Sequence, residues 1–198
     1  NTIKENDQTN FSINIDGVAK NYTTSDGVIF LGGKNVVGLT GSVSGATSFS
    51  DLMEIRNETD GKIFIYTQNN SASEYSIGMS GNYTKLTNNG GIYLGIIPGT
   101  TVISDTVSGF TGINSNTDSS KNLNFIGMYG IGTKLENYSI ISDRPTNTLT
   151  NNSEKGIGMY GKKSNSSGSI LNNGTINIGL KGIGILGEGV STSDRMSV

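Results

Sequence analysis

The ten residues at positions 155–164, KGIGMYGKKS, contain the letters of two phosphate-binding loops. Residues 156–161 spell G-x-G-x-x-G, and Lys163 stands where the P-loop motif G-x-x-x-x-G-K-[ST] needs a magnesium-binding hydroxyl. A dinucleotide loop also opens a helix and has an acidic residue about 20 positions further on. Here the polar run SNSSGS follows, and the same letters return at residues 182–187. The recurrence indicates a structural repeat, so we expect no nucleotide to bind.

Catalytic side chains are scarce. The chain has no cysteine and no histidine, which excludes a Ser-His-Asp triad, a Cys-His pair and an ordinary zinc or copper site. A glycosidase needs two facing carboxyl groups roughly 5–10 Å apart. The close groupings are Asp51 with Glu54, Glu58 with Asp60, and Asp143 with Arg144. They lie in spacers or turns, where solvated charge is the ordinary explanation. We expect no catalysis, no cofactor and no metal site.

Aromatic residues are the best binding candidates. Tyr129 and Tyr160 occupy the same position in two copies of the sequence IGMYG, where we expect both rings to point outward. Outward rings can stack on sugars or anchor a protein partner, although scattered surface aromatics are also normal. Phe110 is the only aromatic residue in the stretch 96–124, the longest gap between motif copies. This stretch forms an extra coil or a protruding loop, and loops on rigid scaffolds often carry function.

The elements that position these residues come from an internal repeat. The motif [IV]-G-[MLI]-x-G occurs from Val37, Ile77, Ile126, Ile157 and Ile183, with starts 40, 49, 31 and 26 residues apart. A second arm reads LTNNGGIYLG from Leu86, LENYSIIS from Leu135, ILNNGTINIG from Ile170 and, more loosely, IRNETDGKIFIY from Ile55. The shared pattern of this arm is an aliphatic residue, any one residue, Asn, a short polar turn, and then a strand in which apolar and other residues alternate. Two paired arms indicate a solenoid.

Each arm has the pattern of strands that meet at corners. Apolar residues alternate at Ile176, Ile178 and Leu180, and alternation resumes with shifted parity at Ile183 and Ile185. The shift predicts a corner at residues 181–182, where glycine supplies the dihedrals. No stretch has a sustained helical period, and the 29 glycines disfavour helices.

A right-handed parallel β-helix fits these patterns. At about 20–30 residues per coil, the chain would form roughly seven or eight irregular coils and a rod about 35 Å long. We expect a single segment over residues 1–198, with residues 1–25 less clearly part of the repeat. Asn88, Asn137 and Asn172 should stack as a ladder at the turns. Open coil ends would expose strand edges, so caps or further coils should lie outside this fragment of a longer rod.

Charge and hydropathy limit the partners. The net charge is −2 and no Lys/Arg cluster occurs, so nucleic acid is an unsuitable partner. No apolar run approaches the roughly 20 residues of a membrane-spanning helix, so we expect no direct membrane insertion by this segment. The polar start NTIKENDQTN resembles no signal peptide, and the missing initiator Met suggests a processed piece of a longer protein.

The recurrent IGMYG, IGILG, LNNGTINIG and KGIGMYG resemble the passenger repeats of fusobacterial type V autotransporter adhesins. The resemblance is closest over residues 126–189 and weaker over residues 37–95. It implies a right-handed parallel β-helix on the bacterial surface, carried to the outer membrane by a C-terminal translocator barrel. The absence of cysteine fits export through a pore. The sequence departs from the complete pattern because it contains no signal peptide and no barrel.

From this resemblance we expect a cell-surface adhesin segment that contacts a host-cell or bacterial surface protein or glycan, or that serves as the scaffold for such a site. The alternative is a β-helix polysaccharide-processing enzyme or a phage-type receptor-binding protein. Binding of glycans or receptors would favour the adhesin. Release of reducing ends from polysaccharides would favour the enzyme.

Overall fold

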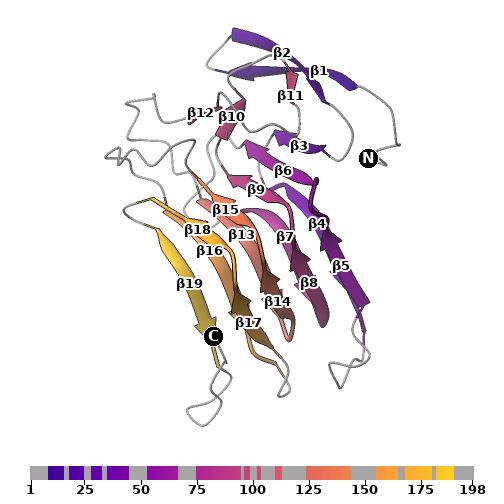
Figure 1. Ribbon diagram of the computed structural model, residues 1–198, viewed down its shortest axis with the longest axis vertical. Helices are drawn as coiled ribbons and strands as arrows, with labels where there is room; N and C mark the ends of the chain where they lie inside the picture. Colours follow the sequence, from indigo (N-terminus) through magenta and orange to yellow (C-terminus); the bar gives the residue numbers. More distant parts are fainter. Residues whose placement is uncertain are drawn as a thin grey trace.

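The chain folds into parallel β-sheets (Figure 1). The computed structural model describes residues 9–15, 18–24, 28–32, 35–44, 53–66, 75–94, 96–98, 102–103, 110–112, 124–143, 155–164, 168–179 and 182–189. Every regular element in these residues is a strand, and none is a helix. The predicted all-β class is confirmed, and the three parallel sheets are those of a parallel β-helix or solenoid.

Three sheets form the body of the molecule. The first sheet contains β4 (Val37–Ser42), β7 (Ser76–Asn82), β13 (Asn124–Ile131), β16 (Lys155–Lys162) and β19 (Ile183–Glu188). The second contains β5 (Met53–Asn57), β8 (Thr84–Asn88), β14 (Lys134–Asn137) and β17 (Ser169–Asn172). The third contains β3 (Val28–Gly32), β6 (Lys62–Tyr66), β9 (Gly91–Leu94), β15 (Ile140–Ser142) and β18 (Thr175–Asn177). Within each sheet the strands stack in chain order.

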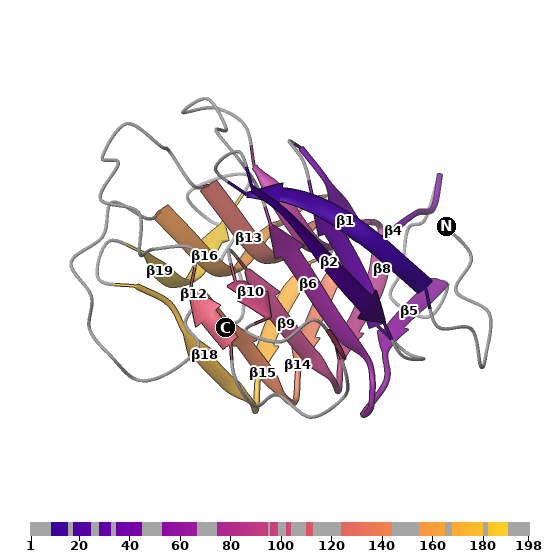
Figure 2. The same cartoon turned by 90° about the horizontal axis from the view of Figure 1, so that it is seen from above.

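The chain visits the three sheets in turn, so each round is one coil (Figure 2). The rounds are β4-β5-β6, β7-β8-β9, β13-β14-β15 and β16-β17-β18, with β3 before them and β19 after them. The first residues of all five motif copies are register neighbours in the first sheet, as the repeat predicted. The count of seven or eight coils is not confirmed, because one round takes 26–49 residues.

The remaining strands pair outside the three parallel sheets. β1 (Thr9–Ile15) and β2 (Val18–Thr24) form an antiparallel hairpin, and β11 (Val102–Ile103) adds to β2 in parallel. β10 (Ile96–Pro98) and β12 (Phe110–Gly112) form an antiparallel pair. The described strands within residues 96–112 therefore add no strand to the three parallel sheets.

The interior is built from columns of equivalent residues. Met79, Met128 and Met159 line the first sheet, Leu86, Leu135 and Ile170 the second, and Ile63, Ile92 and Ile141 the third, all buried in one hydrophobic cluster. Beside the isoleucine column, Phe30, Phe64 and Tyr93 stack with centroid distances of 6.3 Å and 4.9 Å. Each coil thus buries its apolar face on the next coil.

A column of glycines interrupts the alternation of the first sheet. A Cβ at Gly127 would lie 2.4 Å from Ile141 in the core and 2.5 Å from the Gly158 carbonyl oxygen. Because Gly127 and Met128 both face the core, Ile126 lies on the other side of the strand. Ile126 and Ile157 are buried but lie outside the connected cluster, so the motif does not follow a simple strand alternation.

The asparagine ladder is confirmed. The Asn57 amide donates to Asn88 at 2.8 Å, Asn88 donates to Asn137 at 2.7 Å, and Asn137 donates to Asn172 at 2.7 Å. The first three side chains are buried, and Asn172 is half-buried at the end of the ladder. The ladder satisfies polar groups where the second sheet turns into the third, and it fixes the register of successive coils.

Candidate binding surface

Tyr129 and Tyr160 lie side by side on the first sheet. They are register neighbours on β13 and β16, and both are half-buried. Their ring centroids are 5.2 Å apart and the planes are inclined by 65°, an edge-to-face contact that aromatic pairs favour. Each tyrosine follows a core methionine, so strand alternation directs both rings away from the interior, as predicted.

Phe110 is not brought to this pair as a strand neighbour. It is the first residue of β12, which pairs with β10 and not with the first sheet. Its side chain lies outside what the structure describes. Of the three predicted binding residues, the first sheet therefore unites Tyr129 and Tyr160.

Three residues from neighbouring positions surround the tyrosines. Leu186 on β19 is the register neighbour of Tyr160 and is half-buried. Glu188 accepts a hydrogen bond from the Tyr160 hydroxyl, and its Oε2 lies 3.9 Å from Nζ of Lys162. Both charged side chains are nearly half exposed, so this ion pair is weak. We call Tyr129, Tyr160, Leu186 and Glu188 the tyrosine patch.

The electrostatics of the patch follow from burial and one carboxylate. Burial, followed by the hydrogen bond and charge of Glu188, raises the pKa of Tyr160 to about 12. Burial and the Glu188 charge also raise the pKa of Tyr129. Both hydroxyls are therefore protonated at neutral pH; the Tyr160 proton is donated to Glu188, and both oxygens can still accept hydrogen bonds. The patch combines two aromatic rings, an aliphatic side chain and an anionic acceptor.

The tyrosine patch lies at one end of a column of equivalent outward positions on the first sheet, and the residue type at these positions changes along the stack. The outward position after the core residue of the motif is, in stack order, Thr40, Ser80, Tyr129, Tyr160 and Leu186. The column is polar in the first two coils and aromatic or aliphatic in the last three. Large apolar side chains thus gather at the β19 end of this face, where they can exclude water from a contact.

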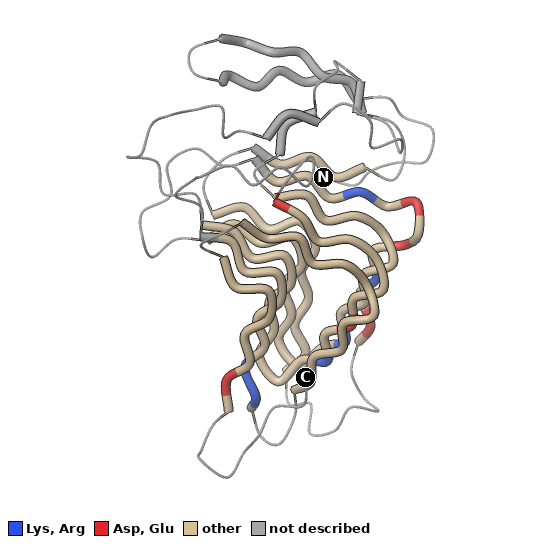
Figure 3. The backbone as a smooth tube through the Cα atoms, turned by 60° about the vertical axis from the view of Figure 1, so that its left-hand side comes forward, with Lys and Arg blue, Asp and Glu red and all other residues tan. Residues whose placement is uncertain are grey.

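Carboxylates gather separately, on the second sheet. The Lys85 Nζ lies 3.0 Å from Glu54 and 3.4 Å from Glu136, and Lys134 lies 2.6 Å from Glu136. In Figure 3 these charges run along one side of the stack, while most of the backbone carries none. The hydrogen bond with Lys85 is the main cause of the lowered pKa of Glu54. Burial acts to raise the pKa of Glu136, but Lys134 and Lys85 together lower it.

The described residues of the other acidic groupings also make contacts within the fold. Glu58 pairs with Arg56 at 3.4 Å, and one carboxylate oxygen of Asp143 accepts a hydrogen bond from the Gly179 backbone at 2.9 Å. Asp51 and Arg144 lie outside the described residues. Across the part of the chain that the structure describes, no cluster of three acidic residues is arranged to hold a metal ion, and no helix is long and apolar enough to span a membrane.

The glycine-rich motif is part of a strand. Residues 156–161 lie within β16, and a Cβ at Gly158 would approach the Gly184 carbonyl oxygen of the next strand to 2.5 Å. The expected strand is confirmed, because a phosphate loop would open a helix instead. These glycines allow neighbouring backbones to approach closely.

The sequence predicted the two tyrosines but missed Leu186 and Glu188. The signal was present, since the copy IGILG places Leu186 in the tyrosine column and Glu188 two residues beyond it. Models of protein families, curated proteins and solved structures contain no match to this chain.

Proposed function

We propose that this segment is part of a cell-surface adhesin and that the tyrosine patch is its contact surface. The observation that carries the proposal is the edge-to-face pair of Tyr129 and Tyr160, held in register beside Leu186 and Glu188. The partner is a surface protein or glycan of a host cell or another bacterium. Aromatic anchors ringed by polar groups are typical of such contacts.

The parallel sheet suits the tyrosines to this role. Backbone hydrogen bonds and buried methionines fix the strands beneath them, so little side-chain freedom is lost when a partner binds. Exposed tyrosines contribute large contact areas, and their hydroxyls retain hydrogen-bonding capacity. The patch is thus preorganised, and the half-exposed Lys162 and Glu188 form its polar edge.

The cellular context belongs to the same proposal. We assign the stack to a right-handed parallel β-helix, one stretch of a longer autotransporter passenger displayed at the bacterial outer membrane. The repeated motif with paired arms and the absence of cysteine support this assignment. We assign the segment no catalytic activity.

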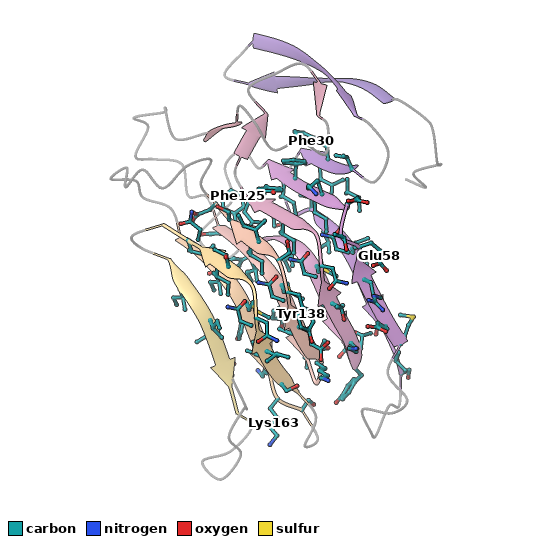
Figure 4. All side chains as sticks on the ribbon, in the orientation of Figure 1. Phe30, Glu58, Phe125, Tyr138 and Lys163 are labelled. Atoms are coloured by element: carbon teal, nitrogen blue, oxygen red, sulfur yellow. The ribbon has the colours of Figure 1, made fainter. Side chains whose placement is uncertain are left out.

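Binding of the purified 198-residue chain to a glycan array and to immobilised host and bacterial surface proteins tests the proposal. The double variant Tyr129→Ala, Tyr160→Ala should bind any captured ligand at least about tenfold more weakly, as expected for hot-spot residues. Tyr138→Ala is the matched control, because Tyr138 is 45% exposed and lies between β14 and β15, outside the first sheet (Figure 4).

Circular dichroism should show that both variants keep the fold. Equal losses for the double variant and for Tyr138→Ala would contradict the proposal, as would no binding on either panel. Release of reducing ends from a polysaccharide panel would instead favour the enzyme hypothesis.

A further inference from the structure

We propose that the tyrosine patch binds an arginine side chain of a partner protein. This inference rests on the proposed function, because it names the chemistry that the same contact surface recognises. The patch presents two aromatic rings, on Tyr129 and Tyr160, and one carboxylate, on Glu188. Aromatic faces and carboxylates both attract positive charge, so the three groups act together on a cation and oppose an anion.

Glu188 lies close enough to act on both tyrosines. It follows Leu186 by two residues on β19, so both side chains lie on the outward face of the sheet, beside Tyr160 and the residues that follow it. The Glu188 carboxylate accepts a hydrogen bond from the Tyr160 hydroxyl, and its charge raises the pKa of Tyr129 as well as that of Tyr160. A cation bound to Glu188 therefore lies near the tyrosine pair.

The cation that already faces Glu188 holds it weakly. Lys162 is the register neighbour of Glu188, yet its Nζ lies 3.9 Å from Oε2, which is longer than a hydrogen bond. The two side chains are 49% and 44% exposed, so water screens this ion pair. Lys163 lies beyond the end of β16 and donates its backbone N–H to the Glu188 carbonyl at 2.8 Å. A cation that contacts the carboxylate directly would displace Lys162.

A guanidinium group fits this arrangement better than an ammonium group or a sugar does. It is planar and weakly hydrated, so it can stack on a ring while its N–H groups bind a carboxylate. The planes of Tyr129 and Tyr160 are inclined by 65°, so only one ring can lie parallel to a flat ligand. A neutral sugar would stack on that ring without using the charge of Glu188, and a sugar acid would be repelled by it.

The proposed contact does not use the open edge of β19. Side chains stand perpendicular to a sheet, and Leu186 and Glu188 face outward together with Tyr160. A further strand beside β19 would extend the sheet and leave this face uncovered. The patch therefore keeps its outward face both in this segment and in a longer stack.

NMR titration of the 198-residue chain with Nα-acetyl-arginine amide tests the proposal, because the method detects the weak binding of a single side chain. The amide signals of Tyr129, Tyr160 and Glu188 should shift with a dissociation constant of about 1–10 mM. The citrulline analogue has nearly the same shape but no charge, so it should bind at least about tenfold more weakly. The lysine analogue should bind at least about threefold more weakly than the arginine probe.

Three variants identify the groups that hold the cation. Glu188→Gln keeps an oxygen that accepts from the Tyr160 hydroxyl but loses the charge, so it should bind the arginine probe at least about fivefold more weakly. Lys162→Gln removes the competing ammonium group and should bind the probe about twofold more tightly. Glu58→Gln is the matched control, because it removes one exposed carboxylate from the second sheet, and it should bind like wild type.

The proposal is overturned if the arginine probe shifts none of the patch signals, if the citrulline or lysine analogue binds as tightly, or if Glu188→Gln binds the probe like wild type. The proposed contact surface survives these outcomes when the double variant Tyr129→Ala, Tyr160→Ala still loses a ligand captured on the glycan or protein panel. Glycan capture that needs both tyrosines, without a response to arginine, would assign the patch to a glycan instead.

Discussion

Removing one rung from the middle of the asparagine ladder should destabilise the stack strongly. Asn137 donates to Asn172 at 2.7 Å and to the Ser139 carbonyl at 3.1 Å, and it accepts from Asn88 at 2.7 Å. The side chain is fully buried. Asn137→Ala removes these bonds and leaves the Asn88 amide and the Asn172 carbonyl without their ladder partner.

The magnitude follows from the two orphaned groups. A buried polar group left unsatisfied costs about 1–3 kcal/mol, so with two such groups Asn137→Ala should lower the free energy of unfolding by about 2–6 kcal/mol. Asn172 ends the ladder, so Asn172→Ala leaves only the Asn137 amide without its ladder partner, and that amide still donates to the Ser139 carbonyl at 3.1 Å. Its expected cost is about 1–2 kcal/mol. The difference between the two variants tests the ladder more sharply than either value does.

Urea unfolding, monitored by circular dichroism, measures the free energy of unfolding of both variants. The midpoint and slope of each transition are compared to detect a loss of two-state behaviour. Asn88→Ala should resemble Asn137→Ala, because Asn88 also has ladder neighbours on both sides. If the middle and end variants lose the same stability, within about 0.5 kcal/mol, cooperation along the ladder is refuted and the asparagines act as separate turn residues.

Three further outcomes are expected. Gly132→Ala should lower stability by at least about 1–2 kcal/mol in thermal unfolding, because Gly132 has a φ of +57° and the new Cβ would lie 2.6 Å from a tyrosine ring. Ultraviolet titration should find the pKa of Tyr160 at about 12, and a lower pKa in Glu188→Gln. The stability that is linked to this raised pKa is present below pH 10.0 and is lost as the pH rises toward 12. The lowered pKa of Glu136 contributes stability above pH 4.5 that is lost on acidification, so in Lys85→Met the urea midpoint should fall less between neutral and acidic pH.

The stack could be predicted from the sequence because it is specified by short motifs that recur along the chain. Each [IV]-G-[MLI]-x-G copy supplies a core residue, and each Asn of the second arm supplies a turn, so matching copies predicted matching coils. Asn88, Asn137 and Asn172 were predicted as a ladder from spacing alone, and the structure places them within hydrogen-bonding distance. The looser arm from Ile55 adds Asn57 to the ladder.

The features that the sequence left open depend on contacts between distant residues. The break in alternation at Gly127 arises because the carbonyl of Gly158 and the side chain of Ile141 approach it from two other strands. No pattern within the motif reveals that approach. The predicted coil count is not confirmed, for another reason. Spacers between motif copies vary in length, and their described residues add no strand to the three sheets, so chain length does not convert into coils.

Inward and outward positions of the same motif are under different constraints. The inward residue is always apolar, as Leu39, Met79, Met128, Met159 and Ile185, because every coil must pack on the next. The outward residue that follows it changes from Thr and Ser to Tyr and Leu without any change in register. The stack therefore tolerates polar residues at this position and does not require Tyr129 or Tyr160. Because packing does not demand these aromatic side chains, the tyrosine patch is the surface that we propose for partner contact.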